Sequence, residues 1–303
     1  MRIRKLLRVR FVVDPFTEQE KIMAELTPMM QKYMETKEQY KDCILFYRLG
    51  DFYEMFFDDA LVASKELEIT LTGKSCGLEE RAPMCGIPYH AVEGYLSKLV
   101  SRGYKVAICE QVEDPKLAKG LVKREVIRVV TPGTNLNVQS LEAGKNNYLL
   151  SIAYTPDGIG ISAADVTTGD YYVTEVEDLK KLNDELMKYE PSEIICNEAF
   201  LVSGFDVNDL KSRLHISVNA LESHMFDDDG CRRILMKHFK VNTLIGLGVE
   251  EFPTGLLAAG ALLQYLYDTQ KTDLEHFTHI YPYLTSKYML LDSSTRRNLE
   301  LTE

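Results

Sequence analysis

The order of apolar and polar positions in the first half of the chain predicts short strands separated by helices. Runs of apolar and aromatic residues indicate strands, whereas apolar positions that recur every three or four residues indicate helices. We expect strands at residues 43–49, 69–72, 105–112 and 123–130. We expect helices at residues 29–40, 58–67 and 89–102, and a polar loop at 73–83. This order predicts a compact α/β unit.

The second half opens with a different pattern, in which three short strands follow one another at 148–155, 158–166 and 170–176. The dipeptides Asp157-Gly158 and Thr168-Gly169 are hairpin turn signals between them. The elements expected afterwards are a helix, a short strand and two further helices, at 179–189, 193–196, 229–239 and 255–267. The last helix is apolar nearly all round and rich in small residues, which predicts that it is buried. A meander followed by α/β alternation predicts a second domain.

These patterns divide the chain into five segments. Residues 1–22 do not resemble the rest, and we expect a poorly ordered extension there. We expect the first domain at 23–135, a linker at 136–144 and the second domain at 145–265. Residues 266–303 open an element with no room to finish, so we expect the truncated start of a further domain there.

The charge is unevenly distributed. The chain of 303 residues has a net charge of −11, and residues 131–303 alone carry 14 Lys and Arg against 26 Asp and Glu. This acidity argues against general adhesion to nucleic acid. If any part of the chain contacts a polyanion, the nearly neutral first half is the candidate.

The cysteines and the apolar segments indicate the compartment. The six cysteines form no C-x-x-C pair, which is typical of free thiols in a reducing cytoplasm. No apolar run approaches the roughly 18 residues of a membrane span. The basic, apolar start is broken by arginines and lacks a small-residue cleavage site, so we expect neither export nor a membrane partner.

Residues 48–54 carry the first candidate site. In a strand, Phe52 and Glu54 point to one face and Tyr53 to the other. An aromatic ring beside a single hydrogen-bond acceptor could insert between stacked bases, and the acceptor could then hydrogen-bond the unstacked base. The pattern is equally typical of an ordinary strand, with Phe52 in a core and Glu54 at a strand end.

Other residues of the first domain could contact a nucleic-acid backbone. Tyr89 and His90 are candidates for polar contacts. A subset of the basic residues could form a phosphate track, which the sequence alone does not select. These basic residues are Lys74, Arg81, Arg102, Lys105, Lys123, Arg124 and Arg128.

Three enzymatic alternatives have weaker support. Gly73-Lys74-Ser75 resembles the end of a phosphate-binding loop, but the glycine required five residues earlier is Glu68. Cys85 and His90 could form a nucleophile pair or half a zinc site, but no second ligand pair has metal spacing, and a turn explains the segment. A metal nuclease would need carboxylates that converge on the metal ions, and the candidates are Asp157, Asp165 and Asp170.

Several long motifs, in order and in register, resemble the MutS family of bacterial DNA mismatch repair proteins. In the first domain these are residues 46–56, 84–92, 107–112 and 128–134, which contain Phe-Tyr-Arg-Leu-Gly-Asp-Phe-Tyr-Glu and Gly-Ile-Pro-Tyr-His. Residues 246–250, 258–270 and 292–300 resemble later parts of the same family. The resemblance runs from about residue 23 to residue 303.

The resemblance implies an α/β fold class with three parts. These are a mixed-sheet mismatch-recognition domain, an RNase H-like α/β connector domain and a truncated α-helical start of the core domain. By resemblance, Phe52 is the wedge that stacks on a mispaired base, and Glu54 hydrogen-bonds that base. Of the polar and basic residues above, we take Lys74, Tyr89, His90 and Lys105 as candidates for contacts with the DNA backbone.

The resemblance also implies partners and cofactors of the full-length family protein. These are mismatched double-stranded DNA, the repair protein MutL at the connector, and a second copy in a homodimer. The full-length protein is an ATPase that uses ATP and Mg²⁺, whereas this chain has no Walker A loop and is not expected to be an enzyme or to hold a cofactor. Two alternatives stay open: an interaction module that does not bind DNA in isolation, and an RNase H-like metal nuclease.

Overall fold

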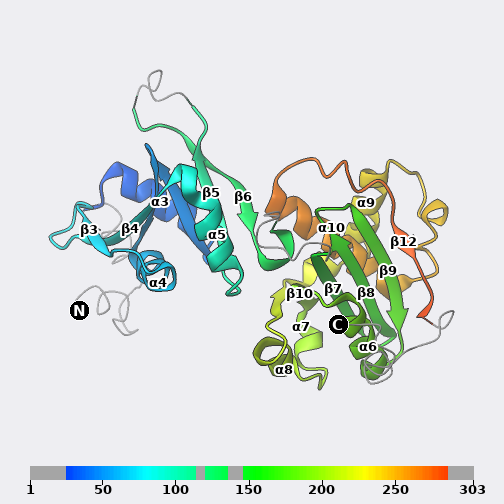
Figure 1. The fold of residues 1–303 in the computed structure, drawn as a ribbon. Coiled ribbons are helices and arrows are strands. Elements are labelled where there is room, and N and C mark those ends of the chain that lie inside the picture. Colours follow the sequence, from blue (N-terminus) through cyan, green and yellow to red (C-terminus); the bar gives the residue numbers. More distant parts are fainter. Residues whose placement is uncertain (1–24, 114–119, 136–145, 286–303) are drawn as a thin grey trace, which may run out of the picture. The chain divides into compact units, whose positions relative to one another are not determined.

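The computed structural model describes residues 25–113, 120–135 and 146–285 (Figure 1). The extension expected at 1–22, the linker expected at 136–144 and residues 286–303 of the segment expected at 266–303 lie outside them. The described residues form two mixed sheets with helices, so the chain is an α/β protein. No described helix combines the length and the apolar character needed to cross a membrane.

The first sheet has six strands in the order β3-β4-β2-β1-β5-β6. The pairs β1 with β2, β2 with β4, and β3 with β4 are antiparallel. The strands are β1 Cys43–Leu49, β2 Phe52–Phe56, β3 Thr72–Lys74, β4 Ala82–Pro88, β5 Lys105–Gln111 and β6 Arg124–Val130. The helical segments between them are α3 Pro28–Gln39, α4 Phe57–Leu67, η1 Tyr89–Ala91 and α5 Val92–Val100.

The core of this sheet is organised around the buried Tyr33 of α3. Its ring meets that of Phe56 edge-on, with centroids 4.9 Å apart, and its hydroxyl donates to Asp59 over 3.2 Å. Asp59 also accepts from the backbone N–H of Leu45 and pairs with Lys37 at 2.9 Å. Burial raises the pKa of Asp59, and Lys37 opposes this rise. The carboxylate therefore joins both helices to β1.

The second sheet has six strands in the order β11-β10-β7-β8-β9-β12. β7, β8 and β9 form the expected antiparallel meander, and β10 runs parallel to both β7 and β11. The strands are β7 Tyr148–Thr155, β8 Gly158–Asp165, β9 Asp170–Val176, β10 Glu193–Asn197, β11 Ser217–Leu221 and β12 Tyr281–Pro282. A meander continued by parallel strands agrees with the RNase H-like arrangement that the resemblance implies.

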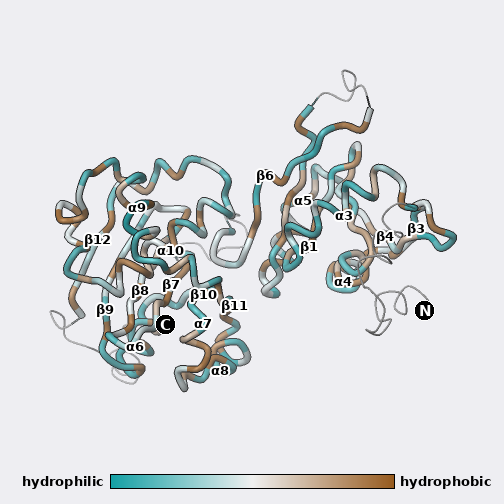
Figure 2. Tube along the Cα trace, turned by 180° about the vertical axis from the view of Figure 1, so that it is seen from behind, coloured by the Kyte–Doolittle hydropathy of each residue, from teal (hydrophilic) through white to brown (hydrophobic). Residues whose placement is uncertain are grey.

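Helices cover both faces of the second sheet (Figure 1 and, from the opposite side, Figure 2). One buried cluster joins the sheet to α9 and α10, and a second joins it to α6, α7 and α8. The helices are α6 Leu179–Tyr189, α7 Glu198–Leu201, α8 Val207–Ser212, α9 Asp228–Phe239 and α10 Pro253–Gln270. At Gly260 of α10, an added Cβ would lie 2.3 Å from the Cβ of Cys231 in α9. The small residue is thus required for close packing, and the prediction that this helix is buried is confirmed.

Several expected elements differ from the structure. The strand expected at 69–72 is wrong: β3 begins at Thr72 and pairs as a short strand with β4. The turn expected in the segment between Cys85 and His90 is also wrong, because Gly86 and Pro88 lie in β4. Pro88 lies beyond the residues of β4 that pair with β3, where β4 has the character of an edge strand, and edge strands accept proline. The short elements α7, α8, β11 and β12 were not expected.

The helix α10 continues past residue 265, where we expected the second domain to end. Leu274, Phe277 and Ile280 then belong to the buried cluster that contains α10. β12 pairs with β9 and extends the second sheet. Described residues after 265 therefore complete the second sheet and its core.

Glu193 is a fully buried carboxylate that ties the turn after β6 to the second sheet. It accepts hydrogen bonds from the backbone N–H of Gly133 at 3.0 Å, from the amide of Asn219 at 3.0 Å and from the hydroxyl of Tyr265 at 2.8 Å. An acceptor-only carboxylate matches three donors. Removal of the carboxylate would leave these donors buried without an acceptor.

Substitution Glu193→Ala should therefore lower the free energy of unfolding by about 3 kcal/mol, because each unsatisfied buried donor costs about 1–3 kcal/mol. Urea unfolding followed by circular dichroism measures this loss. Glu251→Ala, at an exposed position, is the matched control and should change stability by less than about 0.5 kcal/mol. Equal effects of both substitutions would contradict the role of Glu193.

Candidate nucleic-acid interface

A tight turn between β1 and β2 places the candidate wedge. Leu49 pairs with Phe52, so Gly50 and Asp51 alone form the turn. Gly50 has φ +59°, whereas Asp51 has no positive φ, which is the sign pattern of a type II′ hairpin turn. Glycine is favoured at the first position because a side chain is strained there.

Phe52 stands at the start of β2 with 46% of its surface exposed. Its neighbours on the other face, Tyr53 and Met55, are 5% and 0% exposed. Phe52 and Glu54 thus share one face, and Tyr53 occupies the opposite face, as the strand period requires. The alternative in which Phe52 belongs to a core is wrong, because its ring is among the exposed large apolar side chains.

Arg48 stabilises the β1–β2 hairpin from the face opposite Phe52. Its guanidinium lies 3.8 Å from the centre of the Tyr89 ring and pairs with Glu110 of β5 at 3.4 Å. The hydroxyl of Tyr53 donates to the same carboxylate. Burial and then this hydrogen bond raise the pKa of Tyr53, so the hydroxyl keeps its proton and donates. Arg48 and Glu110 were not singled out from the sequence, although charged residues inside two apolar strands were a signal for such a pair.

Glu54 is held by a lysine from another strand. Its Oε2 lies 2.5 Å from Nζ of Lys74 in β3. The side chains are 16% and 34% exposed, respectively, so the pair is partly shielded from water. Lys74 is therefore paired with Glu54.

Tyr89 and His90 lie beside the same turn. The backbone N–H of Tyr89 donates to the carbonyl of Asp51 at 3.0 Å, and Pro88 is the register partner of Phe52. Tyr89 is 42% exposed, and His90 is exposed with its ring 5.8 Å from that of Tyr89. The backbone of Tyr89 therefore lies close to the turn before Phe52, whereas its ring packs against Arg48.

Lys105 is the first residue of β5, at the end of that strand opposite Glu110, the residue that contacts the hairpin. Arg124 donates to the backbone carbonyls of Arg48 and Val122, which indicates a structural role. Arg128 donates to the carbonyl of Thr134, and burial lowers its pKa.

Comparison with known proteins gives the family. The model of MutS domain I matches residues 27–139, and that of MutS domain II matches residues 147–278. The DNA mismatch repair protein MutS of Lachnoclostridium phytofermentans is 68% identical over 281 residues, which is 93% of this chain and 30% of that protein. The chain belongs to the MutS family. The first matched segment contains the first sheet, and the second contains every strand of the second sheet except β12.

Further relatives agree with this assignment. The MutS proteins of Ruminiclostridium cellulolyticum and Clostridioides difficile are 52% and 49% identical over 284 and 281 residues. Each match covers 93% of this chain, and 32% and 29% of the respective relative. The chain spans about a third of the length of the curated relatives it matches.

The phosphate-loop alternative has no support in the structure of domain I. In Gly73-Lys74-Ser75, the first two residues are in β3, and Lys74 pairs with Glu54. No described helix begins at Ser75, so the backbone N–H groups that would cradle a phosphate are not assembled. These residues do not fit ATP and Mg²⁺.

The three aspartates of domain II do not converge. Asp157 lies in the turn before β8, whereas Asp165 ends β8 and pairs with Asp170 at the start of β9. Asp165 is fully buried and accepts from the backbone of Asn147 and from Thr167. Because β8 has 8 residues, roughly 20 Å or more separates Asp157, just before the strand, from Asp165 at its end. No metal-ligating cluster occurs among the residues that the structure describes.

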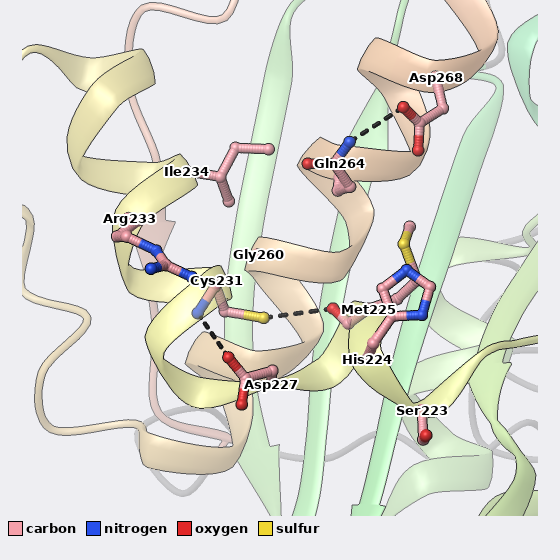
Figure 3. Close-up of a pocket in the computed structure, with 11 residues that line it drawn as sticks. Ser223, His224, Met225, Asp227, Cys231, Arg233, Ile234, Gly260, Gln264 and Asp268 are labelled. Carbon is pink, nitrogen blue, oxygen red and sulfur yellow. Dashed lines mark hydrogen bonds between the residues drawn. The ribbon is translucent and has the colours of Figure 1, made fainter.

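Domain II contains a cavity of about 670 Å³ beside α9 and α10 (Figure 3). Cys231 donates to the carbonyl of Met225 over 3.4 Å, and Gln264 donates to Asp268 over 2.9 Å. The side chains of Cys231 and Gln264 therefore each have a hydrogen-bond partner within the wall of the cavity. The remaining wall includes His224 and Arg233.

The thiol of Cys85 is not placed to act as a nucleophile. It is buried in β4, where its thiol lies 3.6 Å from the carbonyl oxygen of Ala60, whereas His90 is exposed. Burial, followed by the charge of Asp59, raises the pKa of the Cys85 thiol to about 12. The Cys/His pair is therefore not supported.

The thiols should accordingly react slowly in the folded protein. Burial raises the pKa of Cys109, Cys196 and Cys231 to about 12 as well. Because the thiolate is the reactive form and a raised pKa disfavours it, alkylation by iodoacetamide at pH 8 should be on the order of a hundredfold slower than in urea. Mass spectrometry of tryptic peptides measures the rates. Alkylation of native Cys85 at the unfolded rate would contradict this prediction.

Proposed function

We propose that this chain recognises mispaired or looped-out DNA, with Phe52 stacking on the mispaired base and Glu54 hydrogen-bonding it. The observation that carries the proposal is the placement of Phe52. A large aromatic ring stands in solvent at a two-residue turn, beside a half-buried carboxylate on the same face. Membership in the MutS family supports this use of the hairpin.

A wedge of this kind selects mismatches through the cost of unstacking. Separating two stacked base pairs costs a few kcal/mol, and the cost is lower where pairing is already broken. An aromatic ring inserted at such a step recovers stacking on the displaced base, roughly 1–3 kcal/mol. The protein therefore recognises how easily the DNA duplex is deformed, and not its base sequence.

Glu54 should add discrimination more than affinity. A carboxylate close to phosphates is repelled unless it finds a donor. A displaced base offers N–H donors at its edge, whereas a base that is still paired does not offer them freely. The carboxylate thus penalises binding to paired DNA.

We propose the remaining roles from the family resemblance. Tyr89, His90 and Lys105 would contact the DNA backbone, whereas Lys74 is paired with Glu54. Domain II would contact MutL, and the full-length protein would act as a cytoplasmic homodimer. ATP and Mg²⁺ would belong to parts of the full-length protein beyond these two domains, so this chain would not be an enzyme. Binding of purified MutL to the chain tests the second role, and its absence would contradict that role.

Substitution Phe52→Ala should abolish the preference for mismatched DNA. The loss of stacking should weaken binding to a G·T-mismatched duplex by about 1–3 kcal/mol and leave binding to the paired duplex nearly unchanged. Fluorescence anisotropy on both duplexes, at low and physiological salt, measures the ratio of affinities. Because Phe52 is exposed, the thermal stability of the variant should be unchanged.

Two variants serve as controls for Phe52→Ala. Phe52→Tyr keeps an aromatic plate and should keep the preference. Leu71→Ala removes another exposed apolar side chain of domain I, which is 45% exposed, and should leave the ratio unchanged. A preference that survives Phe52→Ala would overturn the wedge assignment. Absence of binding to either duplex by the unaltered chain would favour the alternative of an interaction module that does not bind DNA in isolation.

A further inference from the structure

Lys74 reaches Glu54 from two strands away. In the order β3-β4-β2, the strand β4 separates the two residues. Gly86 is the β4 register partner of Glu54, and it offers no side chain at that position. The ammonium of Lys74 lies 5.5 Å from the centre of the Phe56 ring and 2.5 Å from Oε2 of Glu54. The lysine therefore passes over buried apolar surface before it meets the carboxylate.

The ion pair with Lys74 involves only one of the two oxygens of the Glu54 carboxylate. Among the residues that the structure describes, the hydrogen bond and the ion pair of Glu54 both involve Oε2. A carboxylate has two oxygens with about four acceptor sites. The second oxygen, Oε1, has no hydrogen bond or ion pair with the described residues.

We propose that Lys74 is a positioning residue for Glu54. This inference rests on the function proposed above. The ammonium fixes the orientation of the carboxylate by binding Oε2, so that Oε1 meets the edge of the displaced base. The same ammonium offsets part of the carboxylate charge.

This role differs measurably from that of a phosphate-binding lysine. Loss of a phosphate contact weakens binding to all duplexes nearly uniformly and lowers the salt slope by about one. Loss of a positioning residue changes the ratio of affinities for mismatched and paired DNA, because only the mismatch uses the oriented oxygen. The ratio therefore separates the two roles.

Substitution Lys74→Met should lower the ratio of mismatched to paired affinity by about tenfold, the effect of losing one charge-assisted hydrogen bond. Lys74→Arg keeps the cation and should restore most of the ratio. In a Glu54→Gln background, Lys74→Met should change the ratio by less than about twofold, because no carboxylate is left to position. Lys123→Met is the matched control, since Lys123 pairs with Glu125 at 2.5 Å.

A measurement without DNA tests the pairing itself. Acetylation of the protein by an amine-reactive ester, followed by mass spectrometry, gives the reactivity of each lysine. Glu54→Gln should raise the reactivity of Lys74 severalfold and leave that of Lys123 unchanged. Unchanged reactivity of Lys74 would overturn the inference.

The DNA measurement has its own contradicting result. Uniform weakening of both duplexes by Lys74→Met, with the ratio intact in both backgrounds, would show a phosphate contact and overturn the positioning role. A wild-type ratio of one would contradict the proposed function, and the acetylation experiment would then still decide whether Lys74 holds Glu54.

Discussion

The turn between β1 and β2 is the constraint on which the candidate site depends. It has room for Gly50 and Asp51 alone, so the register of β2 is fixed against β1. Tyr53 and Met55 fill buried positions, and a shift by one residue would expose them and bury Phe52. Phe52 therefore stands in solvent as a consequence of the packing behind it. An exposed aromatic ring on a fixed strand loses little conformational entropy when it binds.

Paired charges support this hairpin on both faces. Arg48 and Glu110 brace the face opposite Phe52, and Lys74 meets Glu54 on the same face as Phe52. Each carboxylate has a cation beside it. Together with the near neutrality of the first half of the chain, this means that binding would depend on local fit more than on a strong positive field.

The sequence predicted the parts of the structure that depend on local periodicity. The alternation across Phe52, Tyr53 and Glu54, the meander of the second sheet and the buried helix near Gly260 all follow from residue spacing. β4 was missed because Gly86 and Pro88 are turn residues, and pairing with β2 overrides that local preference.

Contacts between residues distant in sequence could not be predicted in this way. Lys74 meets Glu54 across an intervening strand, and Arg48 meets Glu110 between β1 and β5. Glu193 likewise binds Gly133 and Tyr265 only because the fold brings them together. Such pairs depend on strand order, which periodicity does not encode. Phe52 as the wedge came from family resemblance, whereas its exposure came from the structure.

The most direct test of the account is whether binding kinks mismatched DNA. A wedge that enters a base step bends the duplex by roughly 20–90°. Resonance energy transfer between dyes at the two ends of a G·T-mismatched duplex measures this bend. We expect the chain to increase transfer on the mismatched duplex, and the Phe52→Ala variant at saturating concentration to leave it unchanged. Tight binding of the chain to the mismatch without any change in transfer would contradict it.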